Sequence, residues 1–191
     1  MIVETEHTPN PDTLKFLPGK KVSEVGPIEF LKNDKDIKVS LANNILSLDG
    51  AVMVFFGKDF ITVKKKKDIN WEDLKHGIIS EINDYYSKGH NVVVGKNLGL
   101  ANISSKSTSD SRPVQSNKLI DKINEVLDSK VRPAVAKDGG DITFKSFTDG
   151  VVTVELKGSC SGCPSSIMTL KQGVQNLLCH YIPEVKSVEA V

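Results

Sequence analysis

The sequence predicts an α+β protein made of two small α/β-sandwich-like domains joined by a flexible linker. Each half contains a strand pair with turn signals beside amphipathic helix patterns. Between the halves lies a stretch rich in Ser, Gly and Asn, GKNLGLANISSKSTSDSRPVQS. We therefore place an N-terminal domain at residues 1–94, the linker at 95–115 and a C-terminal domain at 116–191.

In the N-terminal half, TLKFLPG predicts a strand, and AVMVFFGKDFITVKKKK predicts a hairpin that turns at Gly57-Lys58-Asp59. A helix should follow with Asn70 as its N-cap, since apolar residues then recur at helical spacing: Leu74, Ile78, Ile82 and Tyr85. A weaker pattern suggests another helix over 39–46. These elements predict a small α+β domain.

Three other features of this half have structural interpretations. We expect Trp71 to be a core residue of its helix and the basic run 64–67 to be a solvated strand edge that discourages pairing. The segment Thr8-Pro9-Asn10-Pro11 is rigid, and the sequence leaves open whether it is a turn or a surface for partner proteins.

The C-terminal half predicts the order helix, strand, strand, helix, strand. The first helix should begin at Ser116 as N-cap and end near Pro133, with an apolar stripe of Leu119, Ile120, Ile123, Val126 and Leu127. DGGD at 138–141 predicts a turn, and Asp149-Gly150 predicts a hairpin between ITFKSF and VVTVEL. Pro164 fits the first turn of the second helix, and VKSVEAV is a last short strand.

Charge and hydropathy exclude several classes of partner. With 25 basic and 24 acidic side chains the net charge is +1, so no overall field holds nucleic acid or an anionic membrane. No apolar run approaches the length of a membrane span, and the first residues, MIVETEHTPNP, lack a signal or transit pattern. We expect a cytoplasmic protein, unless a presequence has been removed.

The segment GSCSGCPSS carries the chemistry, because it places Cys160 and Cys163 two residues apart before a helix. Three cysteines in a chain without an export signal argue against a disulfide framework. The positive end of a helix stabilises thiolates, which favours both metal binding and redox chemistry. Position alone does not choose between these two uses.

Four interpretations of the pair remain. A thiol–disulfide oxidoreductase usually carries the motif after the first strand of a βαβ unit, and here it follows a late antiparallel hairpin. A structural zinc site needs four protein ligands. Cys179 lies roughly 24 Å from Cys163 along the helix, at about 1.5 Å per residue, which is too far for both to bind one metal ion. Cys179 also falls opposite the apolar stripe of the helix. The pair can also be an unligated turn. Finally, two chains together supply the four thiolates that a [4Fe–4S] or [2Fe–2S] cluster takes, which implies a dimer.

Longer stretches resemble a known family. DKINEVLDSKVRPAVAKDGGDITFKSF, GSCSGCPSSIMTLKQGVQNLL and YIPEVKSVEAV resemble the C-terminal domain of NifU as found in Nfu-type iron–sulfur proteins. HTPNPDTLKFLPG and VFFGKDFITV resemble the N-terminal domain that accompanies it in mitochondrial and related bacterial members. The chain lacks the assembly and ferredoxin-like domains of full NifU, so later carriage is expected rather than primary cluster building.

The resemblance implies a non-enzymatic scaffold or carrier. In it Cys160 and Cys163 would ligate a cluster, typically [4Fe–4S], shared between the two subunits of a homodimer and passed to apo-proteins. Upstream cluster-assembly factors are the other implied partners. The implied location is the bacterial cytoplasm, or the mitochondrial matrix if a presequence has been removed. A thiol–disulfide oxidoreductase is the alternative function.

Overall fold

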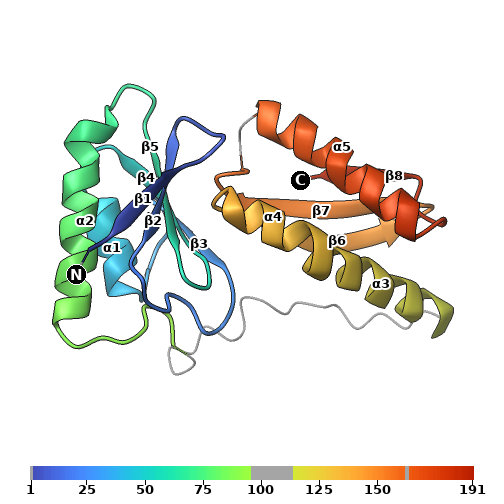
Figure 1. Cartoon of the computed structure of the whole chain (residues 1–191), viewed down its shortest axis with the longest axis horizontal. Helices are drawn as coiled ribbons and strands as arrows, with labels where there is room; N and C mark the ends of the chain where they lie inside the picture. The colour runs from blue at the N-terminus through green and yellow to red at the C-terminus, as the bar shows by residue number, and fades with distance from the viewer. Residues whose placement is uncertain (1, 96–113, 162–163) are drawn as a thin grey trace. The chain divides into compact units, whose positions relative to one another are not determined.

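The computed structural model describes residues 2–95, 114–161 and 164–191, with the backbone alone at 114–117, 164–167 and 169. The chain divides into two compact units, Met1–Lys106 and Ser107–Val191, each with its own hydrophobic core (Figure 1). The predicted α+β class is confirmed. Most of the predicted linker, residues 96–113, lies outside the described residues, so the domain bounds stay predictions. Among the described residues, no helix is both long and apolar enough to cross a membrane.

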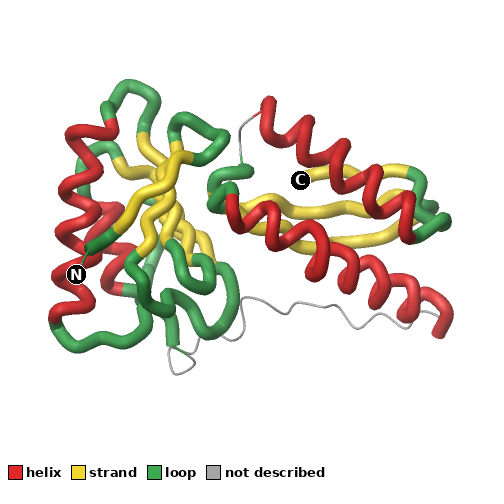
Figure 2. The backbone as a smooth tube through the Cα atoms, viewed as in Figure 1, coloured by secondary structure: helices red, strands yellow, loops and turns green. Residues whose placement is uncertain are grey.

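Unit 1 is built on an antiparallel five-stranded sheet in the order β1-β2-β5-β4-β3, with helices α1 and α2 on one face (Figures 1 and 2). Its elements are β1 (Glu4–His7), β2 (Thr13–Leu17), β3 (Ile28–Leu31), α1 (Ser40–Ser47), β4 (Ala51–Phe56), β5 (Ile61–Lys65) and α2 (Trp71–Ser87). The predicted strand at β2, the β4–β5 hairpin and both helices are confirmed.

Helix α2 packs on the sheet through the predicted apolar face. Leu74, Ile78 and Ile82 are buried, and the last turn buries Tyr86 while Tyr85 is half-buried. Asn70 occupies the N-cap position, although its side chain makes no capping hydrogen bond. The helical spacing of apolar residues therefore accounts for the position of α2 against the core.

The interpretation of residues 64–67 as a solvated edge was wrong. Strand β5 lies between β2 and β4 in the interior of the sheet, so Lys64 and Lys65 pair with neighbouring strands. Lys65 is only 8% exposed. Lys66 and Lys67, beyond the end of the strand, are exposed as expected.

Unit 2 follows the predicted order of elements. Helix α3 (Val114–Val126) continues through a π-helical turn (Leu127–Val131) into α4 (Arg132–Lys137), and β6 (Gly140–Thr148), β7 (Val151–Gly158), α5 (Pro164–Tyr181) and β8 (Ser187–Ala190) follow. β6 pairs antiparallel with β7, and β8 pairs with β7 in parallel. Alternate residues of β7 are buried, namely Val152, Val154 and Leu156. They join the core that Ile123 of α3 and Val174 and Leu178 of α5 complete.

Both predicted ends of the first helix of unit 2 were wrong. Ser116 lies inside α3, which already begins at Val114, and the helical path continues past Pro133 to Lys137. The amide of Arg132 bonds to the carbonyl of Leu127, five residues back, which marks the wider π-helical turn. Pro133 then falls in the first turn of α4, where a missing N–H costs little.

Candidate functional site

The described part of the cysteine segment is a tight turn at the end of β7. Gly158, the last residue of β7, pairs with Gly140 at the start of β6. Ser161 closes the turn, since its amide N–H and its hydroxyl both donate to the carbonyl of Gly158, at 3.2 Å and 2.8 Å. Cys160 therefore sits in a turn with a defined backbone path, which we call the Gly158–Ser161 turn.

The Gly158–Ser161 turn is tied to the DGGD turn that follows α4. The amide of Ser159 donates to the carbonyl of Gly139 at 3.2 Å, and the Ser159 hydroxyl donates to the carbonyl of Asp138. Ser159 is thus held beside residues 20 and 21 positions earlier in the chain. The predicted DGGD turn therefore lies beside the Gly158–Ser161 turn.

Cys160 is buried. Its side chain is 4% exposed, belongs to the hydrophobic core of unit 2 and has its Sγ 3.7 Å from Ser159 Oγ. A Cβ built on Gly140 would lie 2.7 Å from Cys160 Sγ, closer than real contacts allow. The absence of a side chain at residue 140 is therefore what makes room for the thiol.

The second predicted ligand, Cys163, lies outside the described residues. Helix α5 begins at Pro164 as predicted. In residues 2–95, 114–161 and 164–191, no three His, Cys, Asp or Glu side chains gather as a set that could hold a metal ion. Cys160 is therefore the member of the predicted pair whose surroundings can be described.

Cys179 does not lie opposite the apolar stripe of α5, as the sequence suggested. It is half-buried and packs against the core of unit 2 next to the fully buried Leu178. The apolar face of α5 is broad enough to include this flanking position. The side chain of Cys179 therefore packs against the core of unit 2.

A group of three charged side chains, Asp128, Arg132 and Asp141, lies at the end of the DGGD segment, and sequence reasoning did not predict it. Arg132 Nε is 3.3 Å from Asp141 Oδ1 and donates to the carbonyl of Ile142 at 3.0 Å, while its Nη1 lies 2.9 Å from Asp128. Burial raises the pKa of the Asp141 carboxyl, and the charge of Arg132 offsets that rise only in part. The i,i+4 spacing of Asp128 and Arg132 was a sequence signal for the first of these ion pairs.

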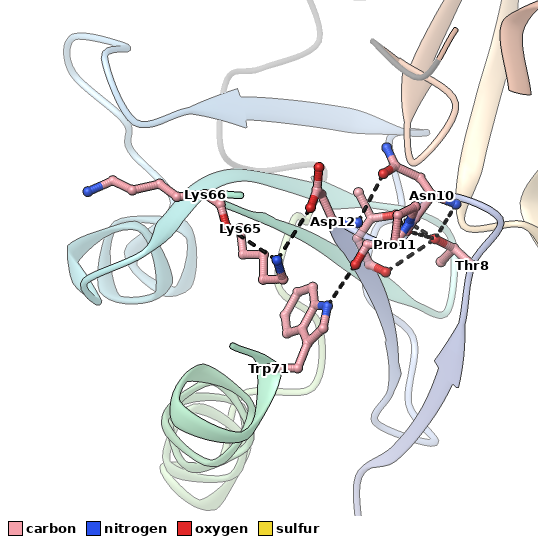
Figure 3. Close-up of polar contacts among 8 residues, drawn as sticks. Thr8, Asn10, Pro11, Asp12, Lys65, Lys66 and Trp71 are labelled. Atoms are coloured by element: carbon pink, nitrogen blue, oxygen red, sulfur yellow. Dashed lines mark hydrogen bonds and ion pairs between the residues drawn. The ribbon is translucent and has the colours of Figure 1, made fainter. Parts of the chain in front are cut away.

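Unit 1 holds a second polar cluster, which Figure 3 shows around the segment 8–12. The hydroxyl of Thr8 donates to the carbonyl of Asn10 at 2.9 Å, and Asn10 Oδ1 accepts from the amide of Asp12 at 3.0 Å. The segment is a turn between β1 and β2, and it closes the hairpin that they form. Of the two interpretations left open, the turn is confirmed.

The same cluster buries a cation. Lys65 Nζ lies 3.3 Å from Asp12 Oδ1 and 5.9 Å from the centre of the Trp71 ring, and the Trp71 indole donates to the carbonyl of Pro11 at 3.0 Å (Figure 3). Trp71 is half-buried and packs on the core while keeping its N–H for the turn. This network fixes the start of α2 against the β1–β2 turn.

Two family models match the chain. The NifU-like domain matches residues 123–189, and the N-terminal domain described as "Scaffold protein Nfu/NifU N terminal" matches residues 3–89. The first contains the DGGD turn and the cysteine pair, and the second contains the segment 8–12. Both sequence resemblances are therefore confirmed.

Curated relatives match over the whole chain. "NifU-like protein 4, mitochondrial" of Arabidopsis thaliana is 43% identical over 191 residues, which is 99% of this chain and 65% of the relative. "NFU1 iron-sulfur cluster scaffold homolog, mitochondrial" of Homo sapiens is 40% identical over 192 residues, covering 100% of this chain and 72% of the relative. The chain thus spans about two thirds of the length of these relatives.

A solved structure is also similar. The solution structure of a NifU-like protein from Saccharomyces cerevisiae is 25% identical, covers 50% of this chain and 86% of its own, and has a TM-score of 0.46. From the two family models and the full-length matches at about 40% identity, the chain belongs to the NifU-like (Nfu) family of iron–sulfur cluster scaffold proteins.

Proposed function

We propose that this protein carries a [4Fe–4S] cluster, held by Cys160 and Cys163 and bridged between two copies of the chain, and delivers it to apo-proteins. The observation that carries the proposal is the position of Cys160. It stands in a hydrogen-bonded turn directly ahead of an 18-residue helix, in a chain of the NifU-like family. The cluster is the cargo of this protein rather than a fixed cofactor.

The ligand count supports a bridged cluster. A cubane cluster normally takes four thiolates, and one chain offers two in this segment. A second copy completes the set. The amide groups and dipole at the start of α5 favour the charged form of nearby thiols, which is the form that binds iron.

Delivery requires only ligand exchange. A thiolate of the client protein binds an iron that Cys160 or Cys163 holds, and the released cysteine takes up a proton. No general acid–base pair and no substrate turnover are needed, so we propose a non-enzymatic carrier. Its partners would be apo iron–sulfur proteins and the factors that load the cluster. The mitochondrial relatives favour the mitochondrial matrix over a bacterial cytoplasm for this step.

Anaerobic reconstitution with ferrous iron and sulfide tests the proposal. We expect the wild type to form a brown dimer with one [4Fe–4S] cluster per two chains, measured by Mössbauer spectroscopy and native mass spectrometry. Cys160→Ala and Cys163→Ala should each stay colourless and monomeric. Cys179→Ala is the matched control, since its thiol packs in the core of the same unit, and it should bind the cluster as the wild type does.

Two results would contradict the carrier proposal. One is a colourless monomer whose cysteine pair cycles between dithiol and disulfide and reduces insulin, which is the behaviour of an oxidoreductase. The other is a dimer with stoichiometric zinc that iron does not replace, which indicates a structural site.

A further inference from the structure

We propose that Gly140 and Ser159 are positioning residues that keep the Cys160 thiol buried, and that turning this thiol outward is a step in cluster loading. The buried position of the thiol is independent of the proposed function, whereas the outward turn during cluster loading rests on that function.

Burial of Cys160 conflicts with ligation in the observed position. A metal–thiolate bond is about 2.3 Å long, as in zinc sites, and a cluster extends well beyond its first metal atom. The Cys160 side chain is 4% exposed and is surrounded by the core of unit 2. A cluster has no access to the sulfur there, so the side chain must leave this position before it can bind iron.

Gly140 provides the space that the buried thiol occupies. A Cβ at residue 140 would lie 2.7 Å from Cys160 Sγ and 2.7 Å from the carbonyl oxygen of Lys157. The sulfur can move away by rotation about the Cα–Cβ bond of Cys160, whereas the Lys157 carbonyl belongs to the β6–β7 ladder. Glycine at residue 140 is therefore the condition for the inward position of the thiol.

Ser159 fixes the backbone on the other side of the thiol. Its amide and its hydroxyl bond to the consecutive carbonyls of Gly139 and Asp138. These two bonds hold the residue next to Cys160 against the DGGD turn, so they keep the backbone of the Gly158–Ser161 turn in the conformation that places the thiol in the core. The hydroxyl bond can be removed by a single substitution, and the amide bond then remains.

The buried position suits a protein that must give up its cargo. On loading, Cys160 loses its proton and its sulfur binds iron outside the core. On release, a client thiolate replaces it, and Cys160 takes up a proton and returns to the space over Gly140. Because the returned thiol regains its place in the core and its 3.7 Å contact with the Ser159 hydroxyl, the cluster-free form is stabilised and the chain holds the cluster less tightly.

Alkylation of the cluster-free full-length chain by iodoacetamide tests the positioning, with each cysteine quantified by tandem mass spectrometry. Ser159→Ala removes the hydroxyl bond to the carbonyl of Asp138 and the 3.7 Å hydrogen bond of that hydroxyl with Cys160 Sγ. The turn should then open more often, so we expect the alkylation rate of Cys160 to rise about fivefold. Gly140→Ala should raise it further. In both variants Cys179 should react at its wild-type rate, because it lies in the same core but not in the turn.

Two control variants make the same kinds of change away from Cys160. Ser129→Ala removes a serine hydroxyl bond to a backbone carbonyl, that of Glu125 at 2.7 Å, and Gly173→Ala adds a Cβ that meets nothing within 4 Å. Both should leave the Cys160 rate unchanged. If Gly140→Ala speeds Cys160 and Cys179 together, the unit has unfolded, and Ser159→Ala alone then decides. An unchanged Cys160 rate in Ser159→Ala overturns the positioning role.

Cluster loading separates this inference from the proposed function. With ferrous iron and sulfide, Ser159→Ala should gain cluster absorbance several-fold faster than the wild type and Ser129→Ala. Slower loading in Ser159→Ala would mean that the buried position is the binding position, which overturns the inference. A wild type that takes up no cluster refutes the proposed function and the loading step, while the alkylation rates still decide whether the thiol is held.

Discussion

The indole N–H of Trp71 donates a 3.0 Å hydrogen bond to the backbone carbonyl of Pro11, 60 positions earlier in the chain. This bond joins the first residue of α2 to the turn between β1 and β2. Lys65 adds a second link, since its Nζ lies 3.3 Å from Asp12 Oδ1 and 5.9 Å from the centre of the Trp71 ring. A side chain of the helix therefore adds to the hydrogen bonds within the segment 8–12 that hold the turn.

Trp71→Phe should loosen this turn. The variant keeps an aromatic ring on the core but leaves the Pro11 carbonyl without its donor, which should lower the stability of unit 1 by about 1 kcal/mol. Amide exchange at residues 8–13, measured by mass spectrometry, should become faster. Peptides from β6 and β7 in unit 2 are the control and should not change. Wild-type exchange at residues 8–13 would mean that the bond does not hold the turn.

Asp12→Asn should destabilise unit 1 more than a surface change does. Lys65 is nearly buried, with 9% of its side chain exposed, and Asp12 lies 3.3 Å away. Removing the carboxylate charge leaves a buried cation with the carbonyl of Lys66 and the Trp71 ring for compensation. We expect a loss of about 2 kcal/mol in urea unfolding, between the values for exposed and fully buried pairs.

The neighbouring pair Lys66–Asp49 is a matched control, because its atoms are 3.5 Å apart and its side chains are 46% and 90% exposed. Asp49→Asn should cost less than about 0.5 kcal/mol. Equal losses for Asp12→Asn and Asp49→Asn would show that burial does not strengthen the Lys65 pair. The double variant with Lys65→Met should recover part of the loss of Asp12→Asn, since no buried charge then remains.

Gly150→Ala should destabilise the β6–β7 hairpin for two separable reasons. Gly150 has φ of 89°, which strains any residue with a side chain, and a Cβ there would lie 2.8 Å from Cδ of Lys186. Gly89→Ala in unit 1 isolates the first reason, because Gly89 has φ of 85° and open space around its Cα. We expect about 1 kcal/mol for Gly89→Ala and a larger loss for Gly150→Ala, each measured by urea unfolding. Equal losses would mean that Lys186 moves aside freely.

Sequence patterns predicted the elements whose signals are local. The hairpin at Asp149-Gly150 follows from two positive φ angles that this dipeptide tolerates, and α2 follows from the spacing of Leu74, Ile78 and Ile82. Strands β1 and β3 were not predicted, since each has four residues and includes charged side chains. Their place in the sheet depends on the neighbouring strands, which a local pattern does not contain.

In the candidate site, too, the features with a local sequence signal were predicted and the long-range contacts were not. Cys160 was identified from its spacing to Cys163 and from the helix that follows. The space over Gly140 that its sulfur occupies and the bond of Ser159 to Asp138 join segments about 20 residues apart, so they required the folded hairpin. The burial of Lys65 was missed for a related reason, since strand order decides whether a charged strand end is an edge.

Asp141→Asn should change how the stability of unit 2 depends on pH. Burial raises the pKa of the Asp141 carboxyl above its ordinary 3.8, so the folded unit binds this proton more tightly than the unfolded chain does. The contribution of Asp141 is therefore fully present at low pH and is lost as the pH rises through the folded pKa. In urea unfolding from neutral pH down toward 3.8, the wild type should gain stability relative to Asp141→Asn.

Glu155→Gln is the matched control, because the expected sign is opposite. Burial alone would raise the pKa of Glu155, but hydrogen bonds and charges from Lys145 and Lys157, at 2.9 Å and 3.3 Å, hold it below the ordinary 4.5. Its contribution is present above 4.5 and is lost as the pH falls through the folded pKa. The wild type should therefore lose stability relative to Glu155→Gln on acidification. If both differences have the same sign, the charge of Arg132 outweighs the burial of Asp141, and the carboxylate is stabilised instead.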